Sequence, residues 1–237
     1  MKLSAPIFRL RRQAKLLARK KSAPLHLALD QIAQREGYRS WSHLSDSNSG
    51  HRRAKQILGE LVSGDLVLLG ARPGHGKTLL GIDLAIEAVR TGRQGYFFSL
   101  EVNEAAVFDR LRALGADEKA IRDSLIIDTS DDICATYIGE RVRNGFADSV
   151  VVIDYLQILD QKRSNSELGV QLEELRSLAH ETPSIVVTIS QIHRSFELKS
   201  KHLPELSDVR LPNPINLALF TKTCFMHEGA ASLQTVS

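Results

Sequence analysis

The chain has 237 residues, enough to bury one sizeable core, as one large domain or as one domain with a small appendage. No run of about 18 apolar residues occurs in it, which excludes a transmembrane helix on length and a membrane-spanning function with it. Cys134 and Cys224 lie far apart and match neither metal-ligand nor redox spacing, so we expect reduced thiols in a cytoplasmic protein.

The formal net charge of +3 conceals an asymmetry along the chain. Residues 1–21 carry eight Lys or Arg and no acid, which leaves 23 basic against 28 acidic residues elsewhere. A basic surface that binds a partner is therefore expected at the N-terminus of this chain. An Arg-rich segment without acids is also compatible with an organellar transit peptide, but here its helical pattern continues directly into a segment with the pattern of folded structure.

The first 46 residues have the pattern of a small helical module. Apolar residues at helical spacing, with basic residues between them, predict an amphipathic helix through Ile7, Leu10, Ala14 and Leu17. A second helix is predicted from Pro24 to Gly37, and a short third one begins near Ser40. A solvated charged face, a nucleic-acid contact and a membrane-surface contact are all open for the basic helix.

A polar segment of small residues, SDSNSG at 45–50, follows the module and is typical of a flexible linker. We therefore divide the chain into a basic helical module at 1–46, a linker at 47–54 and a larger domain at 55–237. A short helix is expected at 55–61, where the larger domain begins.

Apolar runs separated mostly by helical segments make the larger domain an α/β fold with a mostly parallel central sheet. The runs that predict buried strands are 66–69, 96–100, 125–127, 150–153 and 185–189.

The first strand leads into ARPGHGKT at 71–78, and a helical pattern follows. The usual phosphate-loop (P-loop) pattern is G-x-x-x-x-G-K-[ST], and here Ala71 replaces its first glycine. The alternative, an accidental glycine turn, does not account for a strand before the loop and a helix after it. Backbone N–H groups at this helix start can bind phosphates, Lys77 can reach the β- and γ-phosphates of ATP, and Thr78 can hold Mg²⁺. The predicted nucleotide-binding residues are Ala71, Arg72, Pro73, Gly74, His75, Gly76, Lys77 and Thr78.

A second feature of the nucleotide site is the run VVVID, which ends in Asp154. In P-loop enzymes such an aspartate orients Mg²⁺ or its water, although an ordinary turn aspartate is the alternative. The next residue is Tyr155 rather than an acid, so the base that activates water must come from elsewhere. Glu101, at the end of FFSLE, is the natural candidate.

Five motifs in order resemble the RecA-like ATPase domain of the DnaB family of replicative helicases, over about residues 63–225. They are ARPGHGKT at 71–78 with its initial alanine, FFSLE at 97–101, VVIDYLQIL at 151–159, SQIHR at 190–194 and LSDVR at 206–210.

The resemblance implies an ATPase that uses ATP and Mg²⁺, acts on single-stranded DNA and can form a homo-oligomer. It implies that Glu101 polarises the attacking water and that Gln191 senses the γ-phosphate; for Gln191, a surface amide is the alternative. Residues 161–166 with Arg194, Lys199 and Lys201 would face the DNA channel of the family, although solvated loop charges are the alternative.

The chain also departs from the family pattern. LPNPINLALF follows Arg210, where the family has a glycine-containing acidic stretch, and the N-terminal module differs from the usual N-terminal domain. We find no equivalent of the family's C-terminal arginine finger; the candidates to substitute for it are Arg194, Arg210 and Lys222. Two functions therefore stay open: a DnaB-like DNA helicase or translocase, and a RecA-like ATP switch that loads or regulates without unwinding.

Overall fold

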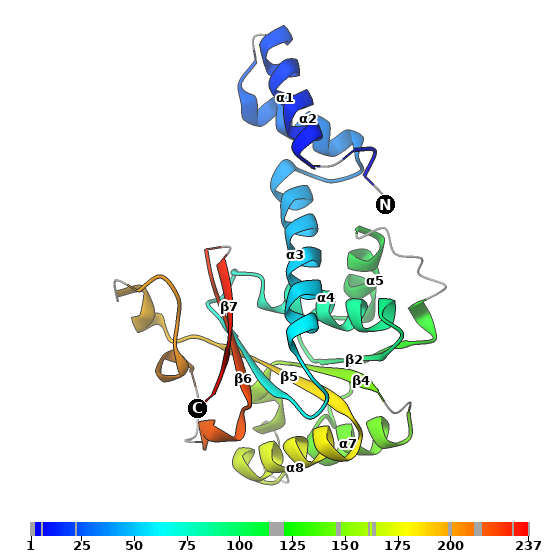
Figure 1. Cartoon of the computed structure of the whole chain (residues 1–237), viewed down its shortest axis with the longest axis vertical. Coiled ribbons are helices and arrows are strands. Elements are labelled where there is room, and N and C mark those ends of the chain that lie inside the picture. The colour runs from blue at the N-terminus through cyan, green and yellow to red at the C-terminus, as the bar shows by residue number, and fades with distance from the viewer. Residues whose placement is uncertain are drawn as a thin grey trace.

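A computed structural model gives the architecture (Figure 1). It describes residues 3–5, 7–21, 23–113, 121–145, 148–160, 162, 165–198, 201–210, 215–228 and 230–236. A layered α/β body occupies one end of the molecule and a small helical module the other, and the long helix α3 (Trp41–Glu60) runs between them.

The body is built on one sheet, in the order β3-β2-β4-β5-β1-β6-β7. Every pairing is parallel except that of β7, which is antiparallel to β6. The five strands predicted from apolar runs are confirmed, whereas the hairpin of β6 and β7 was not predicted. The strands are β1 (Leu66–Ala71), β2 (Gln94–Ser99), β3 (Leu125–Asp128), β4 (Ser149–Asp154), β5 (Ser184–Gln191), β6 (Lys222–His227) and β7 (Ala230–Thr235).

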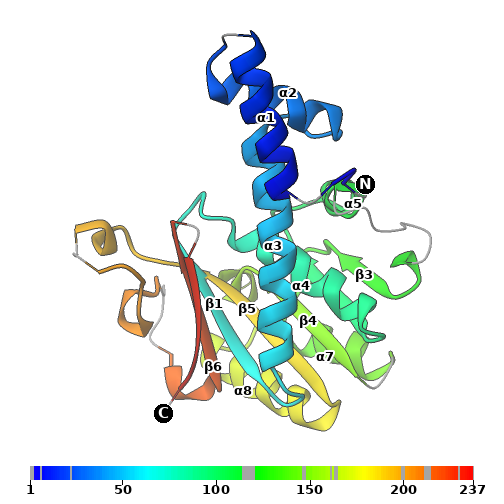
Figure 2. The ribbon, with the colours of Figure 1, turned by 45° about the horizontal axis from the view of Figure 1, so that its top comes forward.

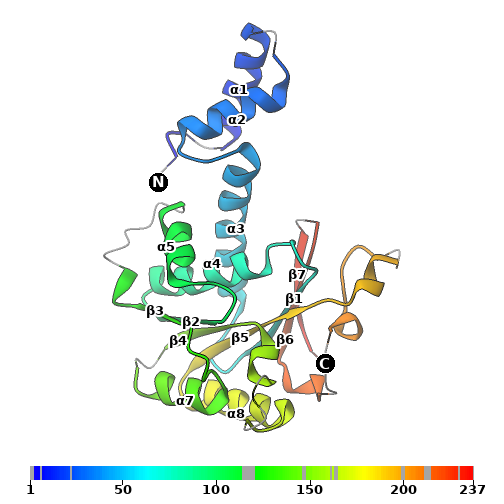
Figure 3. The same cartoon turned by 180° about the vertical axis from the view of Figure 1, so that it is seen from behind.

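Helices cover both faces of the sheet (Figures 1 and 3). The C-terminal part of α3, α4 (Lys77–Arg90) and α5 (Glu104–Ala113) pack on one face, and α7 (Ala135–Arg143) and α8 (Leu168–Glu181) pack on the other. Alternate side chains of the buried strands enter the two layers, with Val150 and Val152 on one side and Val151 on the other. The predicted α/β class with a mostly parallel sheet is confirmed.

The connections of the body include short 3-10 helices. These are η1 (Leu156–Asp160), η2 (Arg194–Leu198), η3 (Leu206–Asp208) and η4 (Leu217–Leu219). Among the described helices, none combines the length and the apolar character that a membrane crossing requires.

The N-terminal module, which Figure 2 shows at the end of α3, has a core of its own. Its helices α1 (Ile7–Lys21) and α2 (Leu25–Arg35) pack together with the start of α3. The buried residues that form this core are Leu10, Ala14, Ile32, Ala33, Tyr38 and Leu44. The predicted pair of helices is thus present.

The expected flexible linker is helical in the structure. Helix α3 runs without interruption from Trp41 to Glu60, through the whole of 47–54, and replaces the two short helices predicted on either side. Its two ends are anchored, since Leu44 lies in the module core while Ile57 and Leu58 lie in the core of the body. Helix propagation between anchored ends overcomes the weak propensity of the polar segment. The division of the chain into domains stays a prediction.

Candidate nucleotide-binding site

Sheet order brings the predicted site residues to one edge. Strands β2, β4, β5 and β1 are consecutive neighbours and run parallel, so their carboxyl ends meet. In the strand register Ser99 pairs with Asp154, and Ala71 pairs with Gln191. Ligands of open α/β sheets bind at this edge, outside the carboxyl ends of the strands.

The P-loop joins Ala71, the last residue of β1, to Lys77, the first residue of α4. Gly74 and Gly76 have φ angles of 82° and 81°, which L side chains rarely adopt. A Cβ at either position would meet no heavy atom within 4 Å, so backbone conformation and not space requires glycine. No side chain caps the N-terminus of α4, which leaves its first N–H groups for an anion.

Asp154, at the end of β4, is completely buried. Neither of its carboxylate oxygens has a hydrogen-bond partner within 3.5 Å among the described residues. Burial raises the pKa of Asp154 to about 6, although the Thr78 hydroxyl and the Lys77 ammonium group nearby lower it, and the Glu101 carboxylate raises it. The predicted site residues Lys77, Thr78 and Glu101 therefore all lie close enough to Asp154 to affect its pKa.

These residues fit the binding of Mg²⁺ together with a nucleotide. An unpaired buried carboxylate beside a hydroxyl is a hard-oxygen donor set of the type that Mg²⁺ prefers. No group of three or more His, Cys, Asp or Glu side chains in the described parts of the chain could hold a metal by itself. Mg²⁺ commonly takes one or two protein ligands and completes its shell with phosphates and water.

Glu101 and Gln191 frame the site from the ends of β2 and β5. Glu101 is exposed, and its backbone N–H donates to the Ser99 hydroxyl at 3.1 Å, which stabilises the turn after β2. Gln191 is half-buried, and its carbonyl oxygen accepts from the N–H of Arg210 at 2.7 Å. Both residues thus occupy the strand ends at which the sequence analysis expects them, one on each side of Asp154.

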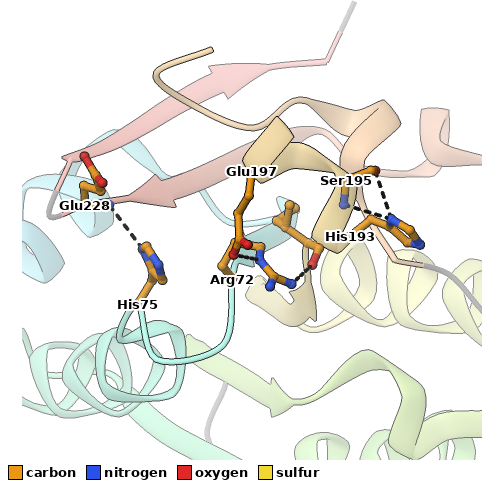
Figure 4. A network of polar contacts seen from close by, with 7 residues as sticks. Arg72, His75, His193, Ser195, Glu197 and Glu228 are labelled. Carbon is orange, nitrogen blue, oxygen red and sulfur yellow. Dashed lines mark hydrogen bonds and ion pairs between the residues drawn. The ribbon is translucent and has the colours of Figure 1, made fainter. Parts of the chain in front are cut away.

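Two P-loop side chains point toward the C-terminal part of the body (Figure 4). The Arg72 guanidinium donates to the Glu197 carboxylate at 2.8 Å and to the Ile192 carbonyl oxygen at 2.9 Å. His75 accepts the N–H of Glu228 at 3.2 Å. Arg72 and His75 were predicted as nucleotide-binding residues, and the structure ties both side chains to other parts of the protein.

The hairpin of β6 and β7 supplies a contact that the sequence analysis missed. The His227 ring stacks on His75 with centroids 4.9 Å apart and meets the edge of Phe196 at 5.0 Å. His227 thus connects the P-loop to η2. The β-favouring run at 223–226 could have indicated the strand, but nothing in the sequence indicates the stacking partner.

The predicted DNA-contacting residues differ in their surroundings. Arg194, at the start of η2, is exposed. Lys201 is exposed too, but its ammonium group is 2.7 Å from the Glu205 carboxylate. Lys199 lies outside the described residues, as does part of 161–166. Of the proposed arginine-finger substitutes, Arg210 is exposed and Lys222 pairs with Asp65 at 3.0 Å.

A family model identifies the family to which the chain belongs. The model of the DnaB-like helicase C-terminal domain matches residues 47–121 and 115–216, well over half of the chain. The chain belongs to this family. DnaB-family ATPase domains bind nucleotides, and the matched segments include the P-loop, Glu101, Asp154 and Gln191. The resemblance seen in the motifs is confirmed.

Curated relatives of this DnaB-like domain are replicative helicases. A probable plasmid replicative DNA helicase of Chlamydia muridarum is 30% identical over 181 residues, which are 63% of this chain and 40% of the relative. The replicative DNA helicase DnaB of Leifsonia xyli subsp. xyli is 28% identical over 193 residues, 68% of this chain and 42% of the relative. The chain thus spans about two fifths of the length of these relatives.

Solved structures support the DnaB-like fold. One solved ATPase domain aligns with a TM-score of 0.57 at 21% identity, and the alignment covers 74% of each chain. A DnaB-like replicative helicase, solved in a study of its interactions with primase, aligns with a TM-score of 0.55 at 22% identity, over 69% of this chain and 47% of that one. The RecA-like fold class is confirmed.

Proposed function

We propose that the chain is a Mg²⁺-dependent ATPase that couples ATP hydrolysis to single-stranded DNA, in the manner of a DnaB-like helicase or translocase. The observation that carries the proposal is the unpaired, fully buried carboxylate of Asp154 beside the P-loop. A buried polar group without a partner costs stability, so its presence at a nucleotide-binding edge favours a functional role.

In this proposal the P-loop backbone holds the phosphates and the buried Lys77 places its charge on the β- and γ-phosphates. Thr78 and Asp154 hold Mg²⁺, directly or through its water. When bound, the metal neutralises charge that develops on the transferred phosphoryl group. Thr78 lies in the first turn of α4, and Asp154 is the last residue of β4.

The remaining roles belong to the two flanking strand ends. The exposed Glu101 accepts a proton from the attacking water as general base. The Gln191 side chain contacts the γ-phosphate. Its backbone carbonyl oxygen accepts a hydrogen bond from the N–H of Arg210, which connects the nucleotide with the segment that follows β5. Arg194 and Lys201 bind DNA phosphates without reading sequence, once Lys201 exchanges Glu205 for a phosphate.

An ATP switch without unwinding is the second candidate. The pairing of Lys201 with Glu205 favours it, because that lysine has a partner already in the absence of DNA. Both candidate functions use the same residues to bind and hydrolyse ATP. They differ in whether single-stranded DNA stimulates the hydrolysis and whether hydrolysis drives strand displacement.

The test measures ATP hydrolysis with and without single-stranded DNA, strand displacement on a forked duplex, and size in Mg²⁺ and ATP. The helicase proposal predicts DNA-stimulated hydrolysis, strand displacement and assembly into an oligomer. An ATP hydrolysis rate that does not change with DNA, together with no strand displacement, would favour the ATP-switch candidate. An absence of ATP binding would refute both candidate functions.

A further inference from the structure

The exposed side of α1 is mostly basic, and Leu16, at 58% exposed, is the large apolar side chain that lies on it within the described residues. Leu10 and Ala14 face the module core, and the basic side chains from Arg9 to Lys21 lie on the remaining surface of the helix. Arg12, Lys15 and Arg19 follow the spacing i, i+3, i+7, which places them in one stripe. The basic residues of this face, which we call the α1 face, are Arg11, Arg12, Lys15, Arg19 and Lys20.

The module does not neutralise the α1 face. The first acidic residue of the chain is Asp30, and its carboxylate accepts the N–H of Trp41 at 2.8 Å. The next, Glu36, accepts the N–H of Ser4 at 2.7 Å. Within the described part of the chain, no residue of the α1 face forms an ion pair. Five neighbouring exposed cations that form no ion pair with a described residue give this face a positive potential, which attracts an anionic partner.

We propose that the α1 face binds the backbone of duplex DNA without sequence preference, as an anchor separate from the ATP site. An α-helix fits the major groove, which is about 12 Å wide. At 15 residues, α1 is about 22 Å long, so its stripe can follow phosphates along the groove. Contacts of this kind supply most non-specific DNA affinity through release of counterions.

The surroundings of the helix argue for a duplex and against other anionic partners. Proteins that bind single strands stack bases on several aromatic side chains, and the sequence of α1 contains one aromatic residue, Phe8, which precedes the basic stripe. A membrane-bound amphipathic helix inserts its apolar face, but Leu10 and Ala14 of α1 are fully buried in the module core. The surface left for a partner is therefore mostly charged.

Helix α3 places this anchor at a distance from the catalytic edge. The module projects from the body on α3, and α1 lies at the far end of the molecule from α7 and α8 (Figures 1 and 2). An anchor at this end of α3 can hold a duplex while the body acts on a single strand. Its DNA affinity should therefore be independent of nucleotide.

The test uses the full chain with Arg12→Gln, Lys15→Gln and Arg19→Gln combined. The matched control combines Arg112→Gln, Arg122→Gln and Arg143→Gln, three exposed arginines of the body. Affinity for a fluorescent duplex of arbitrary sequence is measured against salt, with a single strand, an RNA hairpin and phosphatidylserine vesicles as competitors. Thermal unfolding followed by circular dichroism checks that both variants fold.

We expect the α1 variant to bind the duplex at least about tenfold more weakly, with a salt slope smaller by about 2 to 3, whereas the control stays near wild type. The single change Arg19→Gln should lower the slope by about one. Lys77→Ala should leave duplex binding intact, which separates this anchor from the ATPase proposal. Unchanged slopes in the α1 variants, or preferential binding of the single strand, RNA or vesicles, would overturn the proposal.

Discussion

Arg72 and Glu197 form an ion pair of 2.8 Å between the P-loop and η2, although 125 positions separate them in the sequence. Arg72 is 11% exposed in its side chain and Glu197 is 55% exposed, so the pair lies at the edge of the site. The hydrogen bond from Arg72 holds the pKa of Glu197 below its ordinary value. The pair joins the loop expected to bind phosphate to the segment expected to contact DNA.

We expect Glu197→Gln to weaken the stimulation of ATPase activity by single-stranded DNA. An exposed pair contributes up to about 1 kcal/mol, so the loss should be up to about fivefold, with basal turnover within about twofold of wild type. Steady-state ATPase assays over a DNA titration measure it. Glu181→Gln is the control, because it breaks an ion pair with Arg143 in which the glutamate is about as exposed as Glu197. Equal stimulation of ATPase activity by DNA in both variants would show that the Arg72–Glu197 pair does not couple the P-loop to η2.

Lys77→Ala should weaken binding of Mg²⁺·ATP roughly ten- to hundredfold. Lys77 is 8% exposed, and hydrogen bonds to charged groups contribute about 1.5–3 kcal/mol. Calorimetric titration with a non-hydrolysable ATP analogue measures the change, and the exposed Lys55→Ala serves as control. Full affinity in Lys77→Ala would mean that the nucleotide binds elsewhere.

Glu101→Gln should bind ATP within about threefold of wild type but hydrolyse it about 10²–10⁴-fold more slowly, as expected for loss of a general base. Single-turnover hydrolysis separates the chemical step from binding. Glu104→Gln changes an exposed acid nearby and should keep the wild-type rate. Normal turnover in Glu101→Gln would place the base at another residue.

The parts of this site that the sequence predicts are those with a local signal. Apolar runs identify β1 and β4, and the P-loop and Asp154 follow them directly, so the order of motifs already groups these residues. The contacts of Arg72 with Glu197 and of His75 with His227 join distant segments, and no local pattern encodes them. Their positions depend on the sheet order, which places β1 between β5 and β6.

For helix α3 the sequence does contain a local signal, but this signal predicts the wrong structure. Its segment 45–50 is polar and contains Gly50, a composition typical of linkers. The buried Leu44 before it and Ala54 after it belong to two separate cores, and the packing at both ends makes the helix continuous. Tertiary packing thus overrides local propensity here.

Asp154→Asn should stabilise the protein in the absence of nucleotide and metal. Burial raises the pKa of Asp154 to about 6 from its ordinary value of 3.8, so the folded protein binds this proton more tightly than the unfolded chain does. The contribution of the carboxyl group is therefore favourable below about pH 4 and is lost as the pH rises through 6.

The advantage of Asp154→Asn should consequently grow between about pH 4 and 6 and then level off near 3 kcal/mol. Urea unfolding in EDTA across this range measures it, while ATPase activity in Mg²⁺ should be lost. A stability difference that does not change with pH would contradict the raised pKa.

Arg110→Ala should lower the free energy of unfolding by about 3–5 kcal/mol, because it leaves the carboxylate of Asp83 buried without its main partner. The guanidinium of Arg110, on α5, donates to Asp83, on α4, with Nε 2.7 Å from Oδ1, and both side chains are buried. Arg112→Ala removes an exposed arginine of the same helix and should cost less than about 1 kcal/mol. Similar losses in the two variants would mean that the buried pair contributes little.

The central claim is that the P-loop, Asp154 and Glu101 form one ATP-hydrolysing site. The most direct measurement is the initial rate of ATP hydrolysis in Mg²⁺ by the wild-type chain and by Glu101→Gln, each with saturating single-stranded DNA. We predict hydrolysis by the wild type that EDTA abolishes, and a rate for Glu101→Gln lower by at least about 10²-fold at unchanged ATP occupancy. Absence of hydrolysis in the wild type, or equal rates for the two proteins, would contradict the account.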